Sequence, residues 1–230
     1  MDWVFLLDTL HQLLEGVPLT LELAACSIGA GALLALALAL LRQSGVAPVA
    51  WFVRGYVFAF RGSPLLVQLF LIYYGLSQFP EIRHSFLWVF LRQPFWCAIL
   101  ALTLNTAAYG SEVIRGGLQA VPPGQIEAAR ACGMSGFLLF RRIILPVALR
   151  QALPAYGNEI IIMVKTTSLA SIVTLMEVTG IAARLISETF RAFEVFTCAG
   201  AIYLVLNFLI ARGVGLVEYR LSSHLRPAQS

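Results

Sequence analysis

Lysine is almost absent from the sequence, and its scarcity excludes a large class of enzymes. Lys165 is the only lysine in 230 residues. A P-loop that hydrolyses nucleotides has the pattern G-x-x-x-x-G-K-[ST], in which the lysine contacts the phosphates. Because residues 159–164 contain no glycine, the chain has no P-loop. Its three scattered histidines do not supply the nucleophile, base and orienting group of a catalytic site. We therefore predict that the chain is not an enzyme.

The sequence also lacks the spacings that hold metal ions. Its four cysteines show no C-x-x-C or other metal-ligand spacing, and His84 has no histidine or cysteine partner. Most of the cysteines lie in apolar stretches, where a thiol usually acts as a small hydrophobic group. We predict neither a metal site nor a bound cofactor. The cysteines are Cys26, Cys97, Cys132 and Cys198.

Charge is scarce as well: 12% of the residues are charged, whereas 59% are hydrophobic. This composition is too apolar for a soluble domain, and the long apolar runs place the chain in a bilayer. The formal net charge is +4, and most of the basic excess falls between the apolar runs. That distribution indicates membrane topology rather than nucleic-acid binding. The predicted fold class is an all-α integral membrane protein.

The apolar runs predict five transmembrane helices. In the first, Gly29 and Gly31 allow close helix packing. In the second run, Ser63 as N-cap and Pro64 at the first helical position predict a new helix start. A leading helix therefore ends before Arg61, and the main span follows it. The predicted spans are 17–41, 64–79, 95–116, 147–165 and 195–211, with a re-entrant helix at 168–186.

Residues 1–16 precede the first span. Their apolar and polar side chains fall on opposite helix faces, which predicts an amphipathic helix at the membrane interface. A flexible polar leader is the alternative. The stretch lacks the basic start of a cleavable signal peptide. A single transmembrane domain is expected over 17–222, followed by a tail at 223–230.

Arginine placement predicts the orientation of the spans. Nine arginines fall on one side and four on the other, so the positive-inside rule places the N-terminus outside and the C-terminus inside. The segment 80–93 is then expected to be a polar outer loop. The inner set is Arg42, Arg115, Arg130, Arg141, Arg142, Arg150, Arg212, Arg220 and Arg226, and the outer set is Arg83, Arg92, Arg184 and Arg191.

Several polar side chains interrupt the predicted spans. A polar side chain facing lipid is costly, so each should face protein or water. We predict that they converge on a cavity that binds substrate, with contacts between helices as the alternative. The break at Thr166, Thr167 and Ser168 is a candidate gate, because broken helices at membrane depth line cavities. The substrate candidates are Gln68, Asn105, Tyr109, Glu112, Asn158, Glu159 and Lys165.

The loop at 122–146 is the longest stretch that is neither apolar nor a tail. It predicts a short helix that ends at Gly133 in a left-handed cap. A second helix follows at 137–144 and is expected to end at Pro146. Its arginines place the loop in the cytoplasm. Such a loop suits a docking surface, and a simple connector is the alternative.

The residues of this loop resemble the EAA motif of ABC importer permeases. Glu127-Ala128-Ala129 is followed by Gly133 after three residues and by IILP at 143–146 after nine more. The stretches RGSPLLVQ at 61–68, AYGSE at 108–112 and ALPAYGNE at 152–159 are similar to the polar amino-acid branch, closest to the histidine, lysine-arginine-ornithine and opine permeases. The resemblance covers about residues 16–222.

The resemblance implies a type I ABC importer transmembrane domain with cytoplasmic coupling helices in a bacterial inner membrane. It implies two ATPase subunits that bind ATP and magnesium, a periplasmic solute-binding protein and a second permease subunit, for which the resemblance favours a paralogue over an identical copy. The substrate would be a polar amino acid, with a basic amino acid or opine favoured. An ion-coupled secondary transporter and a passive channel are the alternatives. The implied coupling residues are Glu127, Ala128, Ala129, Gly133, Arg141, Arg142, Leu145 and Pro146.

Overall fold

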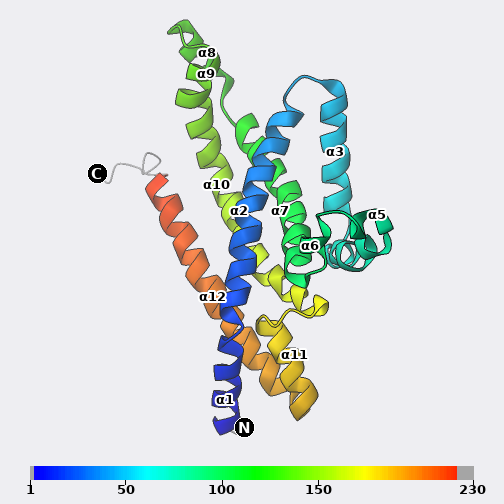
Figure 1. Ribbon diagram of the computed structural model, residues 1–230. Helices are drawn as coiled ribbons and strands as arrows, with labels where there is room; N and C mark the ends of the chain where they lie inside the picture. The colour runs from blue at the N-terminus through cyan, green and yellow to red at the C-terminus, as the bar shows by residue number, and fades with distance from the viewer. Residues whose placement is uncertain (1–2, 222–230) are drawn as a thin grey trace, which may run out of the picture.

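A computed structural model describes residues 3–221, and every regular element in that range is a helix (Figure 1). The α-helices are α1 (Trp3–Leu14), α2 (Val17–Arg42), α3 (Ala47–Gly62), α4 (Leu65–Phe70), α5 (Pro80–Arg83), α6 (Trp88–Leu91), α7 (Pro94–Gln119), α8 (Pro123–Ala131), α9 (Gly136–Leu139), α10 (Leu145–Thr166), α11 (Val178–Thr189) and α12 (Ala192–Leu221). Two π-helical turns, η1 (Leu71–Gly75) and η3 (Phe140–Ile144), and two 3₁₀ turns, η2 (Leu76–Gln78) and η4 (Thr167–Val173), join them. The predicted tail at 223–230 lies outside the described residues.

Three helical stretches are long and apolar enough to cross a membrane: Trp3–Arg42, Pro94–Gln119 and Ala192–Arg220. Two bent pairs pass the same test together. Ala47–Gly62 and Leu65–Gln78 meet at 106°, and Gly136–Val173 and Val178–Thr189 meet at 48°. If each bent pair crosses once, the total reaches the five predicted spans.

α2 and α7 form the centre of the bundle, and Gly31 sets their separation. A Cβ added to Gly31 would lie 2.8 Å from the Thr106 Cβ of α7, so only glycine allows this approach. The predicted role of Gly31 is confirmed. The same prediction for Gly29 is wrong, because nothing lies within 4 Å of a Cβ added there.

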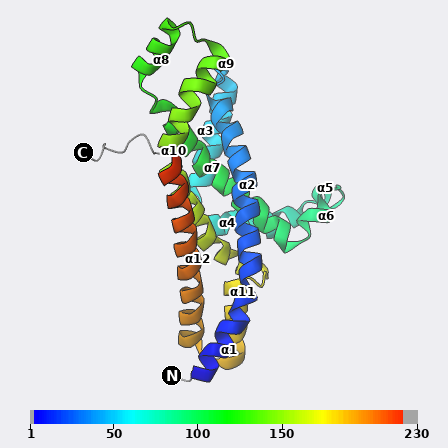
Figure 2. The same cartoon turned by 90° about the vertical axis from the view of Figure 1, so that its left-hand side faces the viewer.

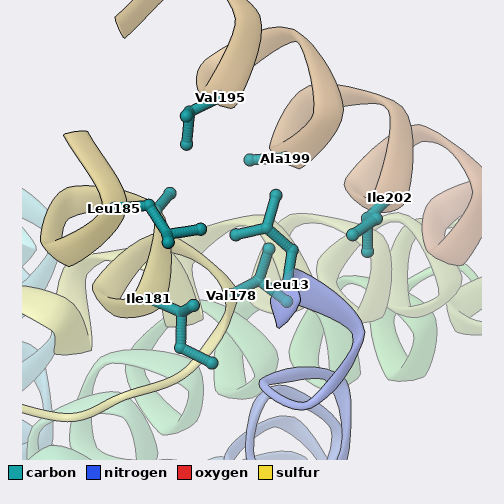
Figure 3. Packing of buried hydrophobic residues seen from close by; sticks show 8 residues of the cluster. Leu13, Val178, Ile181, Leu185, Val195, Ala199 and Ile202 are labelled. Atoms are coloured by element: carbon teal, nitrogen blue, oxygen red, sulfur yellow. The ribbon is translucent and has the colours of Figure 1, made fainter. Parts of the chain in front are cut away.

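The end of the molecule near the N-terminus has a core of its own, where α1, α11 and α12 meet (Figure 3). Leu13 of α1 is fully buried against Val178 and Ile181 of α11 and Val195 of α12. The rest of the predicted α1 stripe is partly outside this core, since Trp3 remains 72% exposed. α1 therefore packs on the bundle with the face that carries Phe5, Leu10 and Leu13.

The corner between α3 and α4 corrects the prediction for the second span. The helix begins at Ala47 and runs beside α2 and α7, whereas the predicted main span from residue 64 turns away by 106°. Ser63 is not an N-cap: it ends α3, and its hydroxyl donates back to the Ala59 carbonyl. Pro64, in extended conformation, stands at the N-cap position of α4. A residue before proline avoids the helical region, so Ser63 is extended and the chain turns there.

The predicted re-entrant helix begins later than expected. The chain passes from α-helix to 3₁₀-helix at Thr167, continues to Val173, and breaks at Thr174, which has a left-handed backbone with φ 68°. α11 then starts at Val178 rather than at residue 168. The chain stays helical through the predicted break, and the hydroxyls of Thr166, Thr167 and Ser168 donate to carbonyls of the preceding turn.

The segment 80–93 is not the polar loop that the arginines suggested. It forms two single-turn helices, α5 and α6, and several large apolar side chains on it are exposed. The prediction of a polar loop was wrong because it rested on the charged residues of this segment and not on the phenylalanines between them. The exposed side chains are Phe86, Leu87, Val89 and Phe90.

Candidate functional site

α8 and α9 form one end of the molecule, beyond the ends of α2 and α7 (Figure 1). α8 closes with two backbone hydrogen bonds, from the Gly133 N–H to the Arg130 carbonyl and from the Met134 N–H to the Ala129 carbonyl. This is a Schellman motif, which requires a left-handed residue after the cap. Gly133 has φ 81°, so the predicted left-handed cap is confirmed.

Pro146 does not end the second helix, contrary to the prediction. The helix runs from α9 through η3 into α10, with Pro146 in the first turn of α10. Proline lacks an N–H and clashes with the carbonyl four residues earlier. The π-helical turn at Phe140–Ile144 changes the hydrogen-bond register before the proline, which lets the helix continue.

Four of the eight predicted coupling residues line an open groove between α8 and the start of α10. The groove has a volume of about 430 Å³. Ala128, Ala129, Arg142 and Pro146 line it, whereas Leu145 faces an apolar cavity on the other side of α10. Glu127, Gly133 and Arg141 are exposed and do not line the groove. Cys132, Met134 and Arg150 also line the groove and were not predicted.

A second cavity lies where the corner between α3 and α4 meets α7 and α10. It has a volume of about 490 Å³. Three of the predicted substrate residues line it: Asn105, Tyr109 and Glu159. The candidate gate residue Thr166 also lines it.

Arg61 supplies the positive charge of this cavity, and the sequence prediction missed it. Its guanidinium lies 5.1 Å from the centre of the Tyr109 ring, a cation–π contact. Within the described residues, neither Arg61 nor Glu159 has an ion pair or a side-chain hydrogen bond. Unpaired opposite charges on one cavity inside a membrane protein indicate a ligand that carries both charges. The sequence offered one signal for Arg61, because an arginine within an apolar stretch is unusual.

The side chains of Gln68 and Asn105 form a hydrogen-bonded pair, called the latch below, at the corner between α3 and α4. The Gln68 amide donates to the carbonyls of Phe60 at 2.8 Å and of Ser63 at 3.0 Å, across the corner. Asn105 in turn donates to the Gln68 side-chain oxygen at 3.0 Å. Gln68 is only 6% exposed. Its side chain therefore holds the corner and does not line the cavity.

Glu112 lies away from Glu159, in an arginine cluster. It forms ion pairs with Arg42 at the end of α2 and with Arg115 one turn further along α7. The contact with Arg42 ties the two central helices together, as the alternative interpretation of this residue expected. Asn158 and Lys165 are both exposed on α10 and do not line the cavity. The seven substrate candidates therefore do not all converge.

A buried polar cluster at the start of α11 was also missed. Glu177 is fully buried and caps α11 by accepting from the Gly180 N–H at 2.9 Å. The Tyr203 hydroxyl of α12 donates to Glu177 at 2.6 Å, and the Val178 N–H donates to the Thr20 hydroxyl of α2. These bonds join α2, α11 and α12. No sequence spacing reveals them, because the partners are far apart in the chain.

Comparisons with known proteins agree with this architecture. A family model described as binding-protein-dependent transport system inner membrane component matches residues 27–223. The octopine transport system permease protein OccM of Rhizobium meliloti is 62% identical over 220 residues, covering 96% of this chain and 90% of the relative. The histidine/lysine/arginine/ornithine transport system permease protein HisM of Escherichia coli K12 is 39% identical over 229 residues, covering 99% and 96%. A solved amino acid ABC transporter with histidines is 35% identical with a TM-score of 0.85, covering 96% of this chain and 99% of that one.

Proposed function

This chain belongs to the family of binding-protein-dependent transport system inner membrane components and is a permease subunit of an ABC importer for amino acids or opines; from this premise we propose how it holds its substrate and how it is driven. Its helices adopt the type I importer permease fold. The relatives do not favour a secondary transporter or a passive channel.

We propose that the cavity between Arg61 and Glu159 receives the substrate during transport. An amino acid or opine carries a carboxylate, which pairs with the Arg61 guanidinium, and a cationic group, which pairs with the Glu159 carboxylate. Arg61 thus takes the role that the sequence first suggested for Lys165. Asn105 and Tyr109 add polar contacts on the wall. The observation that carries this proposal is the pair of opposite, unpaired charges on one cavity.

A basic substrate is the favoured class. HisM is named for histidine, lysine, arginine and ornithine, and OccM for octopine. A cationic side chain needs a negative partner inside the membrane, and Glu159 is the one carboxylate among the residues that line the cavity. Asn158 and Lys165, on the exposed side of α10, are assigned to the pathway surface that faces the second permease subunit.

Neutralising Glu159 tests the substrate proposal. Glu159→Gln should lower ATP-driven uptake of a basic amino acid about tenfold or more, because a hydrogen bond to a charged group contributes about 1.5–3 kcal/mol. Glu22→Gln is the matched control, since Glu22 is an exposed carboxylate of α2 that does not line the cavity. Uptake in proteoliposomes is the measurement, alongside the yield of assembled complex. Normal uptake by Glu159→Gln removes this residue from the site, and loss of assembly assigns it a structural role.

We propose that the partner ATPase subunits drive transport by moving α8. ATP and magnesium bind to two partner ATPase subunits, and this chain supplies a surface that they move. Small exposed side chains such as Ala128 let the helix sink into a groove on the partner, while Glu127, Arg141 and Arg142 reach its rim. ATPase closure then pulls the α8 end of this chain toward that of the second permease subunit. Thr166, Thr167 and Ser168 serve as the gate that responds.

The proposed assembly has five spans, with the N-terminus outside and the C-terminus in the cytoplasm of a bacterium. Nine arginines against four support that orientation. α1 lies at the outer interface, and residues 122–146 form the coupling loop in the cytoplasm. A periplasmic solute-binding protein delivers substrate, and a second permease subunit, a paralogue rather than an identical copy, completes the pathway in the inner membrane.

A further inference from the structure

The segment 79–93, which contains α5 and α6 and is called the flap below, stands off from the helix bundle (Figure 2). Two single-turn helices cannot bury their own apolar side chains. Phe86 is 77% exposed, and Val89 and Phe90 are exposed beside it. The rest of residues 3–221 does not cover them, which leaves lipid or another protein to do so.

The depth of the flap follows from α7, which begins at Pro94 directly after it. α7 has 26 residues. At about 1.5 Å per residue it is about 39 Å long, which exceeds the roughly 30 Å of a hydrocarbon core. If α7 crosses the bilayer, Pro94 must lie near the headgroups of the leaflet opposite α8. The flap is therefore held at that level.

The side chains of the flap match the chemistry of that level. Phe90 packs edge-on against Trp96 of α7, with ring centres 5.6 Å apart, and Trp88 begins α6. Tryptophan and other aromatic side chains concentrate at membrane interfaces. Arg83 and Arg92 are exposed on the same segment, and arginine pairs well with phosphate groups.

We propose that the flap lies in the headgroup region of the leaflet opposite α8, with Phe86 and Phe90 among the upper acyl carbons and Arg83 and Arg92 at lipid phosphates. The flap joins the bent pair of α3 and α4 to α7. A lipid-anchored flap therefore fixes the depth of both walls of the Arg61 cavity.

Tryptophan fluorescence in proteoliposomes tests the proposal. Two variants of the chain retain either Trp88 or Trp96 as the only tryptophan, with the others changed to phenylalanine. Phosphatidylcholine brominated near the headgroup should quench each tryptophan about twofold more strongly than phosphatidylcholine brominated near the chain end, as expected for an interfacial ring. Aqueous iodide should quench weakly. Liposomes of unbrominated lipid give the reference.

Three results contradict the proposal. Strong iodide quenching without bromolipid quenching places the flap in water, as a surface for a soluble partner. Quenching by neither reagent shows that protein covers the flap, as a second permease subunit would. In the otherwise native chain, Phe86→Asp should raise the iodide-accessible fraction, because a charge leaves the acyl region. Gln93→Asp adds the same charge at an exposed polar position and should leave the iodide-accessible fraction unchanged. Equal iodide-accessible fractions in the Phe86→Asp and Gln93→Asp variants also contradict the proposal.

Discussion

Asn105 of α7 donates a 3.0 Å hydrogen bond to the side-chain oxygen of Gln68, and Gln68 spans the corner between α3 and α4. This contact fixes the position of the corner against the central helix. Because Arg61 lies on one side of the corner and Glu159 on the far wall, the width of the cavity depends on this latch.

The latch predicts unequal effects of two substitutions. Gln68→Leu leaves the Phe60 and Ser63 carbonyls without their amide donor, whereas Asn105→Leu leaves one oxygen of Gln68 unpaired. Each buried group left unsatisfied costs about 1–3 kcal/mol. Thermal unfolding in detergent should therefore show a larger loss for Gln68→Leu. Equal stability of the two variants would argue that the corner holds without Gln68.

The packing of α2 on α7 predicts that alanine substitutions at Gly31 and Gly29 change the stability of the protein in opposite directions. Gly31→Ala places a methyl group 2.8 Å from Thr106, and such overpacking costs about 1–3 kcal/mol. Gly29→Ala meets nothing within 4 Å and should stabilise the helix by about 0.5–1 kcal/mol. The melting temperatures of both variants check this pair. A stable Gly31→Ala protein would show that α2 and α7 can separate at little cost.

The proposed gate predicts a kinetic effect. The hydroxyls of Thr166, Thr167 and Ser168 bond within the chain where α-helix becomes 3₁₀-helix. Replacing all three by alanine favours α-helix there. Transport should slow, while binding of the solute-binding protein, measured on immobilised complex, stays normal. Transport at the original rate would make this region a passive bend, with Thr174 as the true end of the helix.

Much of the fold follows from the sequence, because apolar runs and glycines act locally. The first and third spans and the left-handed Gly133 were predicted within a few residues. The corner after α3 was misread because Ser63 followed by Pro64 suits an N-cap, yet the Ser63 hydroxyl donates to the Ala59 carbonyl of the preceding turn and accepts no backbone N–H of α4. Pro146 failed as a helix end for a similar reason, since the π-helical turn before it is not visible in residue types.

The site was harder to predict than the fold. Polar residues in spans mark helix contacts and ligand contacts alike, so Gln68 and Glu112 gave the same signal as Glu159. Only the structure separates them: Glu112 forms ion pairs with two arginines, whereas Glu159 forms none within residues 3–221. Glu177 could be read as an unusual buried acid, but its partner Tyr203 is 26 residues away, and only packing brings them together.

The amount of ATPase subunit that copurifies with the permease tests the central claim, that α8 couples this chain to its energy source. Gly133→Asp puts a β-carbon at φ 81°, which costs on the order of 1 kcal/mol, and adds bulk beside the docking surface. Gly45→Asp is the control, because Gly45 has φ 76° and the same open surroundings in the loop between α2 and α3. The account predicts that Gly133→Asp loses most of the bound ATPase while Gly45→Asp retains it. Full retention by Gly133→Asp would make α8 a connector and contradict the account.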